Sequence, residues 1–147
     1  MSAPSQEDQF RRFAYELQLM QGTAETLQQR LAVLQSVIAD LTVAEGSIAG
    51  LKEVEEGAPI LVPTGGGTFV NANLGDLSKI LINIGANVSI DMSLDEAQED
   101  IAGRLDEVQK ANQAVQQQLG EILTQMQIRR ETLNRLSAGL GGGATGV

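Results

Sequence analysis

The sequence predicts an α+β protein in which a long helix, two β-hairpins and a second long helix follow one another in a single domain of residues 1–147. Apolar residues recur at coiled-coil spacing in both halves of the chain, and they alternate with polar residues in between. Aromatic side chains are few, with three Phe and one Tyr. Compact cores usually include several large rings, so burial is expected along thin interfaces of aliphatic side chains.

The first helix is predicted over residues 5–56 because apolar residues there alternate at spacings of three and four. A repeat of this kind over more than five heptads is typical of a coiled coil. Glu45 is the one polar residue in the series. The repeat positions are Phe10, Phe13, Leu17, Met20, Ala24, Leu27, Leu31, Leu34, Ile38, Leu41, Glu45 and Ile48.

The second helix is predicted over residues 93–139, followed by a flexible glycine-rich tail over 140–147. It begins with "SLDE", a capping box in which Ser93 accepts from the Glu96 amide and Glu96 reaches back to Ser93. Because the helices have similar lengths, an antiparallel pairing is expected. The repeat positions are Leu94, Ala97, Ile101, Leu105, Val108, Asn112, Val115, Leu119, Ile122, Met126, Arg129, Leu133, Leu136 and Leu140.

Residues 58–92 change to a period of two, as in Ile80, Ile82 and Ile84, which predicts four short strands in two hairpins. Two hairpins bury little surface by themselves and leave their edges unpaired. The strands are therefore expected to join those of other subunits. The predicted oligomer interface comprises Ile60, Val62, Phe69, Ile80, Ile82, Ile84, Val88 and Ile90.

The triple glycine in "LVPTGGGTFV" predicts a hairpin turn. A phosphate-binding P-loop needs a Lys and a Ser or Thr after its last glycine and then a helix. Here Thr68 and Phe69 follow Gly67, and the next predicted element is a strand. Gly65 to Gly67 are more suited to the positive φ angles of a tight turn.

Composition argues against several kinds of chemistry. The chain has no His and no Cys, so it lacks the commonest general base and zinc ligand and has no disulfide. A net charge of −9 disfavours nucleic-acid binding. No apolar run approaches the roughly 20 residues of a membrane span. We therefore expect a soluble, cytoplasmic protein that is not an enzyme, with no catalytic, cofactor-binding or metal-binding residue.

Three polar residues, Glu45, Asn112 and Arg129, occupy positions of the helical repeats. Polar residues at such positions commonly set the register of a coiled coil. In an antiparallel pairing where residue i faces about residue 150 − i, Leu17 lies near Leu133 and Glu45 lies near Arg104. We therefore expect Arg104 to pair with Glu45.

The order of elements resembles that of prefoldin subunits, and the four-strand version resembles their alpha class. "LVPTGGGTFVNANLGD" resembles the alpha-class segment LVPxGxGxF followed by a polar strand. "KILINIGANVSIDMSLDEAQE" resembles its second hairpin and the capped helix after it. Together with the two helical repeats, the resemblance covers nearly the whole chain.

The resemblance implies an archaeal-type hexamer of two alpha-type and four beta-type subunits, built on β-barrels made from their strands. It implies an ATP-independent chaperone that holds unfolded proteins at its coiled-coil tips and passes them to a group II chaperonin. Two alternatives remain open. One is a homo-oligomeric, filament-forming prefoldin, and the other is a static coiled-coil scaffold that binds one folded partner.

The predicted client-binding residues lie where both helices approach the chain termini. Helix ends fray, and a two-helix interface cannot fully cover phenylalanine side chains. An adaptable apolar surface of this kind marks interaction sites. The predicted residues are Phe10, Phe13, Leu17, Met20, Leu133, Leu136 and Leu140.

Overall fold

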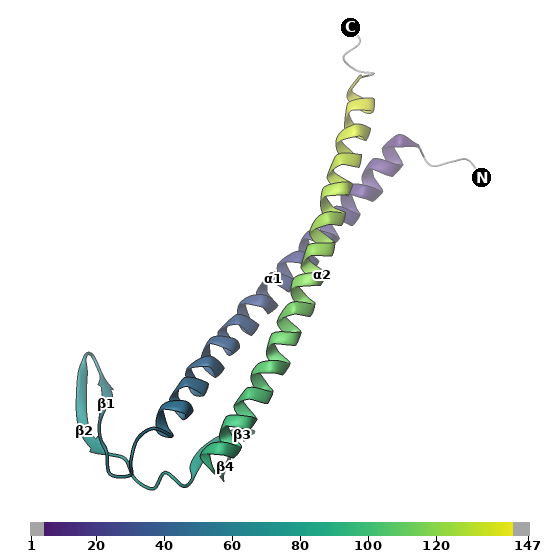
Figure 1. Ribbon diagram of the computed structural model, residues 1–147. Coiled ribbons are helices and arrows are strands. Elements are labelled where there is room, and N and C mark those ends of the chain that lie inside the picture. The colour runs from purple at the N-terminus through teal and green to yellow at the C-terminus, as the bar shows by residue number, and fades with distance from the viewer. Residues whose placement is uncertain (1–4, 143–147) are drawn as a thin grey trace. The chain divides into compact units, whose positions relative to one another are not determined.

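A computed structural model describes residues 5–142 and shows the predicted order of helix, two hairpins and helix (Figure 1). The described residues fall into two compact units. Unit 1 combines the residues up to Gln35 with those from Lys110 onward, and unit 2 is Ser36–Gln109. The elements are α1 (Gln6–Leu51), β1 (Pro59–Gly65), β2 (Thr68–Asn73), β3 (Ile80–Gly85), β4 (Val88–Met92) and α2 (Leu94–Gly142).

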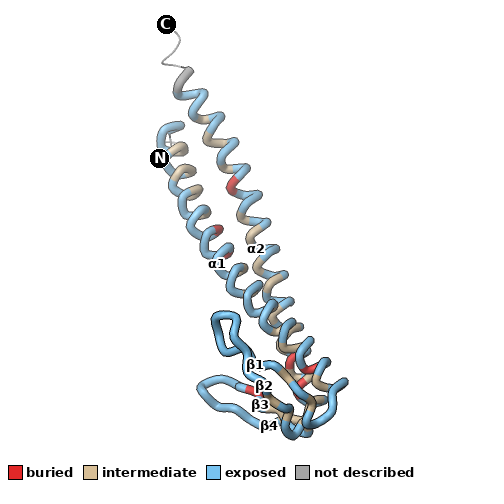
Figure 2. Tube along the Cα trace, turned by 90° about the vertical axis from the view of Figure 1, so that its left-hand side faces the viewer, coloured by how far each residue is buried: buried red, intermediate tan, exposed pale blue. Residues whose placement is uncertain are grey.

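The helical repeats are confirmed by burial. Every repeat position of α1 is buried or half-buried, and so is every repeat position of α2 except Leu140. In unit 1 the most deeply covered are Ala24, Leu27 and Met126. Figure 2 shows buried positions on both helices. The small side chain of Ala24 and the long one of Met126 suit the closely spaced antiparallel helices that the repeats predict.

The ends of α1 differ from the expected range in a way that its sequence explains. Ser5 caps the first turn, where its Oγ accepts a hydrogen bond of 3.1 Å from the Asp8 amide. The helix ends at Leu51, five residues before the expected end at residue 56. Glu53, Glu55 and Glu56 follow this end. Carboxylates are unfavourable there because the carbonyl end of a helix carries partial negative charge.

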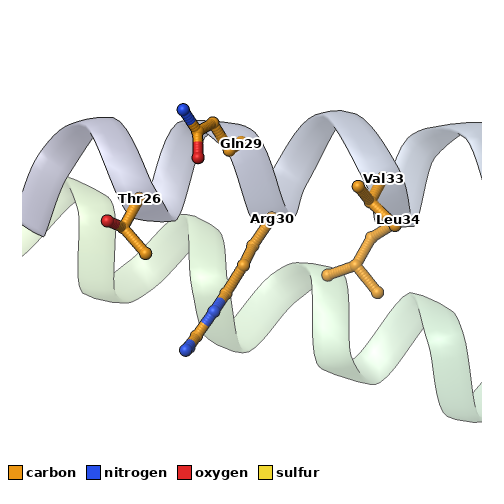
Figure 3. A pocket seen from close by; sticks show the side chains of 5 residues that line it. All are labelled: Thr26, Gln29, Arg30, Val33 and Leu34. Atoms are coloured by element: carbon orange, nitrogen blue, oxygen red, sulfur yellow. The ribbon is translucent and has the colours of Figure 1, made fainter.

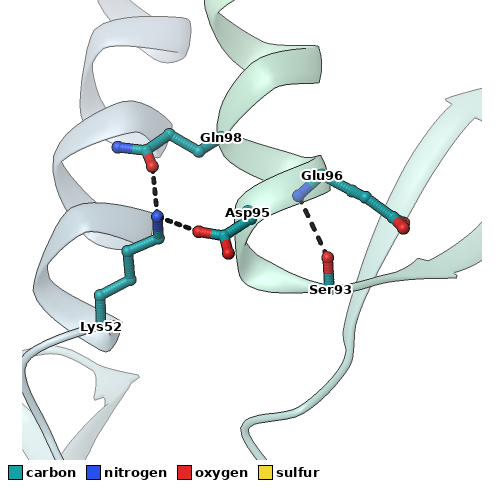
Figure 4. A network of polar contacts seen from close by, with 5 residues as sticks. All are labelled: Lys52, Ser93, Asp95, Glu96 and Gln98. Atoms are coloured by element: carbon teal, nitrogen blue, oxygen red, sulfur yellow. Dashed lines mark hydrogen bonds and ion pairs between the residues drawn. The ribbon is translucent and has the colours of Figure 1, made fainter.

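At the start of α2, the Ser93 Oγ accepts from the Glu96 amide at 3.1 Å, which confirms half of the predicted capping box. The other half is not formed, because the Glu96 side chain points away from Ser93 (Figure 4). The helix continues to Gly142, beyond the expected end at residue 139. Glycine weakens a helix, but unlike proline it does not block one. The expected flexible tail falls largely on residues 143–147, which lie outside the described part of the chain.

The hairpins form two separate two-stranded antiparallel sheets in unit 2. Val62 pairs with Val70 in the first, and Ile82 pairs with Ile90 in the second. The turn interpretation of the triple glycine is confirmed, because Gly65, Gly66 and Gly67 have φ angles of 98°, 56° and 78°. The Thr64 and Thr68 hydroxyls, 2.6 Å apart, hydrogen-bond to each other across the turn.

The second hairpin turns through Ala86 and Asn87, whose φ angles are 50° and 60°. Asparagine tolerates this left-handed conformation, but alanine pays about 1 kcal/mol or more for it. We expect Ala86→Gly to raise the free energy of unfolding by about 1 kcal/mol, measured by urea denaturation. Ala111→Gly, an exposed position inside α2, is the matched control and should lower it by about the same amount. Equal effects of both substitutions would contradict the strain at Ala86.

The core of unit 2 is formed by Ile48, Ile82, Ala97 and Ile101, which come from α1, β3 and α2. This burial revises the expected role of Ile82, which was predicted as part of the subunit interface. Only Ser93 separates β4 from α2. Because the connection is so short, the β3–β4 hairpin stays close to the helix. The part of its face that carries Ile82 is covered by the chain itself, whereas Ile84 on the same face is exposed.

Two polar links accompany this core. Lys52, just after α1, forms an ion pair with Asp95 and hydrogen-bonds Gln98 (Figure 4). Arg104 pairs with Asp100 at 2.8 Å and donates to the Asn83 carbonyl oxygen at 3.3 Å.

The expected pairing of Arg104 with Glu45 is therefore wrong. Among the described residues, Glu45 takes part in no ion pair. Asp100 and Arg104 are four residues apart on one helix, so their side chains are neighbours. This local ion pair forms in place of one between Arg104 and Glu45 on the other helix.

By length and composition alone, α1 is apolar enough to cross a membrane, with a mean hydropathy of 1.4 over its most apolar window. This differs from the expectation that no stretch approaches a membrane span. The reason is the stretch 31–48, where Asp40 and Glu45 are the only charged residues. A single helix of this kind is weak evidence for a span, since core helices of soluble proteins have the same composition.

Candidate functional site

Both hairpins carry large apolar side chains that no other part of the described chain covers. Phe69, the only aromatic residue in the strands, is 60% exposed, and Leu81 is 70% exposed. Among the predicted interface residues, Ile60 and Ile80 are half-buried and Ile82 is buried. The others are exposed and, with their neighbours, form the strand surface, which comprises Leu61, Val62, Phe69, Val70, Leu81, Ile84, Val88 and Ile90.

The predicted client-binding residues all belong to one end of unit 1, called here the terminal end (residues 5–20 and 126–142), which contains the start of α1 and the end of α2. None of them is buried. Six are half-buried, namely Phe10, Phe13, Leu17, Met20, Leu133 and Leu136, and Leu140 is exposed. A groove of about 350 Å³, called here the terminal groove, is lined by Phe10, Leu17, Arg130, Leu133, Asn134 and Ser137. Leu17 and Leu133 thus share a groove, as expected from the antiparallel pairing.

Arg129 occupies an apolar position of the repeat and links the two helices at the terminal end. Its guanidinium lies 3.0 Å from the Glu16 carboxylate and 4.6 Å from the centre of the Phe13 ring. Glu16 also pairs with Arg12 at 3.1 Å, and Arg12 lies 5.7 Å from the same ring. This arrangement tethers Phe13 by contacts between a cation and an aromatic ring.

We expect Arg129→Ala to lower the free energy of unfolding by about 1–2 kcal/mol, because it removes both the ion pair with Glu16 and the contact with Phe13. Thermal unfolding followed by circular dichroism measures the change. The loss should shrink in 1 M salt, which screens the ion pair. Arg135→Ala is the control, since Arg135 is exposed. An effect of Arg135→Ala as large as that of Arg129→Ala would contradict the role of the link.

Asn112, the third polar repeat residue, lies half-buried in unit 1. Its Oδ1 is buried and has no hydrogen-bond partner among the described residues. A buried acceptor without a partner costs free energy. Asn112 therefore lowers the stability of the helix pair locally. This agrees with a polar residue that sets the register of the coiled coil at a cost in stability.

A further groove of about 330 Å³ lies along α1 in unit 1, lined by Thr26, Gln29, Arg30, Val33 and Leu34. In Figure 3, Arg30 and Leu34 extend toward the ribbon of α2, whereas Gln29 points away from it. Val33 is 63% exposed. The helical repeat does not predict this surface because Val33 falls outside the repeat positions. Its only signal is the unusual apolar content of residues 31–48.

The described residues contain no cluster of three or more His, Cys, Asp or Glu side chains that could hold a metal ion. The pKa of the Asp76 carboxyl, between β2 and β3, is lowered by hydrogen bonds from the side chain and the backbone of Ser78. The Ser78 amide lies 2.8 Å from the Asp76 Oδ1. Asp76 is exposed, and these bonds order a local turn.

The fold combines coiled-coil helices with exposed hairpins and the terminal groove. Its main uncovered surfaces are apolar, and such surfaces mark protein–protein interaction sites. The family model for prefoldin subunits matches residues 20–139. The chain belongs to the prefoldin family and is a chaperone-type subunit.

Relatives and a solved structure agree with this assignment. The chain is 32% identical over 112 residues to a prefoldin subunit alpha of Pyrococcus horikoshii, covering 76% of each chain. It is 32% identical over 126 residues to that of Methanococcoides burtonii, covering 86% of this chain and 88% of the relative. Its fold is similar to that of filamentous prefoldin from Methanocaldococcus jannaschii, with a TM-score of 0.65 and 22% identity over 76% of this chain and 92% of the other.

Proposed function

We propose that this chain is the alpha-type subunit of a cytoplasmic, ATP-independent prefoldin that holds unfolded proteins and delivers them to a group II chaperonin. The observation that carries the proposal is the half-buried apolar surface of the terminal end, which includes Phe10, Phe13, Leu133 and Leu136. An unfolded polypeptide exposes the apolar side chains that such a surface accepts. The glycine-rich segment forms a hairpin turn between strands, which agrees with a cycle that does not use ATP.

Assembly is proposed to occur through the strand surface. The described strands pair only within their own hairpins, so each hairpin keeps two edges for pairing with other subunits. Exposed Phe69 and Leu81 supply apolar area that a partner subunit would cover. We infer a hexamer in which two copies of this chain combine with four beta-type subunits.

The second candidate is a homo-oligomer that forms filaments. It is favoured by one specific observation, the similarity in fold to a prefoldin described as filamentous. In this arrangement the same strand surface would pair with other copies of the same chain. Native mass spectrometry of the chain alone and with a beta-type subunit distinguishes the two. A discrete hexamer that requires the beta-type subunit supports the first, and long homo-oligomers support the second.

Aggregation assays test the chaperone function itself. The assembled protein should suppress aggregation of several unrelated denatured proteins diluted into buffer, with no dependence on ATP. A static scaffold for one folded partner would leave the aggregation of these proteins unchanged. Transfer is tested by adding a group II chaperonin to the loaded complex, where the bound client should pass to the chaperonin.

A further inference from the structure

The terminal end differs in charge from the remainder of the chain. It holds five arginines and four acidic residues, a net charge of +1, whereas the whole chain carries −9, which leaves −10 on the remainder. Three of these arginines are engaged by carboxylates of α1, because Arg11 pairs with Glu7 and both Arg12 and Arg129 pair with Glu16. In this acidic chain, the terminal end is thus the place where a negatively charged partner meets least repulsion.

Arg130 combines this charge with the apolar groove. Its side chain lines the terminal groove together with Phe10, Leu17 and Leu133. It is exposed, and among the described residues it takes part in no ion pair. The groove therefore offers a half-buried apolar floor and, at its side, a guanidinium that pairs with no carboxylate in the described part of the chain.

We propose that the terminal groove selects extended polypeptide segments in which an apolar side chain stands beside Asp or Glu. The apolar side chain packs on Phe10, Leu17 and Leu133, and the carboxylate pairs with Arg130, which is suited to bidentate contact with a carboxylate. A segment flanked by Lys or Arg would gain the same apolar contact but would face the guanidinium with like charge. This inference rests on the proposed chaperone function and names the class of client segment that it favours.

The test uses two labelled peptides with the same apolar core, one flanked by glutamates and the other by lysines. Fluorescence anisotropy measures their binding to the assembled full-length protein. We expect the acidic peptide to bind about five- to tenfold more tightly at low salt, a difference that falls as salt rises. Arg130→Gln should abolish most of the preference, and Arg130→Glu should reverse it.

Arg135→Gln is the matched control, because Arg135 belongs to the terminal end and is exposed but does not line the terminal groove. It should keep the preference, whereas an equal loss in both variants would show a general charge effect and overturn the assigned site. Circular dichroism and native mass spectrometry verify that each variant folds and assembles.

The remaining outcomes separate this inference from the function on which it rests. Equal binding of the two peptides by a protein that suppresses aggregation would overturn the charge selection alone. Failure to bind either peptide, together with failure to suppress aggregation, would overturn the proposed function as well.

Discussion

Replacing Ile82 with lysine is expected to disrupt the hydrophobic core of unit 2. It should lower the free energy of unfolding more than any other substitution considered for this chain. Ile82 is 8% exposed and packs with Ile48, Ala97 and Ile101. An unpaired charge in that apolar environment costs several kcal/mol. Ile82→Ala is expected to lower the free energy of unfolding by about 2–4 kcal/mol, as for other large-to-small changes in a core. Urea denaturation measures both.

Leu81 supplies the matched control for Ile82, because it is the next residue in β3 and is 70% exposed. Leu81→Ala should change the unfolding free energy by less than about 0.5 kcal/mol. If the strands form the proposed subunit interface, Leu81→Lys should weaken assembly in sedimentation while the isolated chain keeps its helicity. Equal loss of stability from Ile82→Ala and Leu81→Ala would show that the core does not depend on the inward face of β3.

Removing most of the terminal end is expected to have the largest effect on chaperone activity. Deleting residues 1–20 together with 130–147, with a new initiator Met, removes Phe10, Phe13, Leu133 and Leu136 but keeps the strands and the buried helix contacts of Ala24, Leu27 and Met126. Assembly should survive, and suppression of aggregation should fall sharply. An unfolded chain binds weakly to one surface, so the loss of several such surfaces in one assembly multiplies the effect.

A milder variant separates the apolar surface from the length of the helices. Phe10→Ser with Leu133→Ser keeps the helices at full length but makes the terminal groove polar. Leu19→Ser with Leu123→Ser is its control, because both residues are exposed in unit 1 and neither lines that groove. Suppression of aggregation, measured at equal assembly concentration, should fall for the first pair and stay near that of the unchanged protein for the second. The client site lies elsewhere if the two pairs behave alike.

Local patterns determined most of the architecture. The heptad positions predicted which helical faces are covered, since burial along a helix depends on a periodicity that short-range spacing already contains. The glycines at 65–67 predicted a turn because few other residues adopt positive φ. Ser93 predicted the start of α2 because a cap needs only its own helix. The resemblance of the hairpin segments also identified the family, which the match over residues 20–139 confirms.

What the sequence did not determine depends on contacts between residues far apart in the chain. Ile82 and Ile84 share one alternating pattern, yet Ile82 is buried in the chain's own core and Ile84 is exposed, because only the fold places α2 over one end of that face. Arg104 was expected to pair with Glu45, but in the structure it forms an ion pair with Asp100 and donates a hydrogen bond to the Asn83 carbonyl oxygen. The position of Arg130 beside an apolar groove likewise emerges only when the start of α1 and the end of α2 are brought together. Periodicity specifies which face is covered, whereas the identity of the covering group is set by tertiary packing.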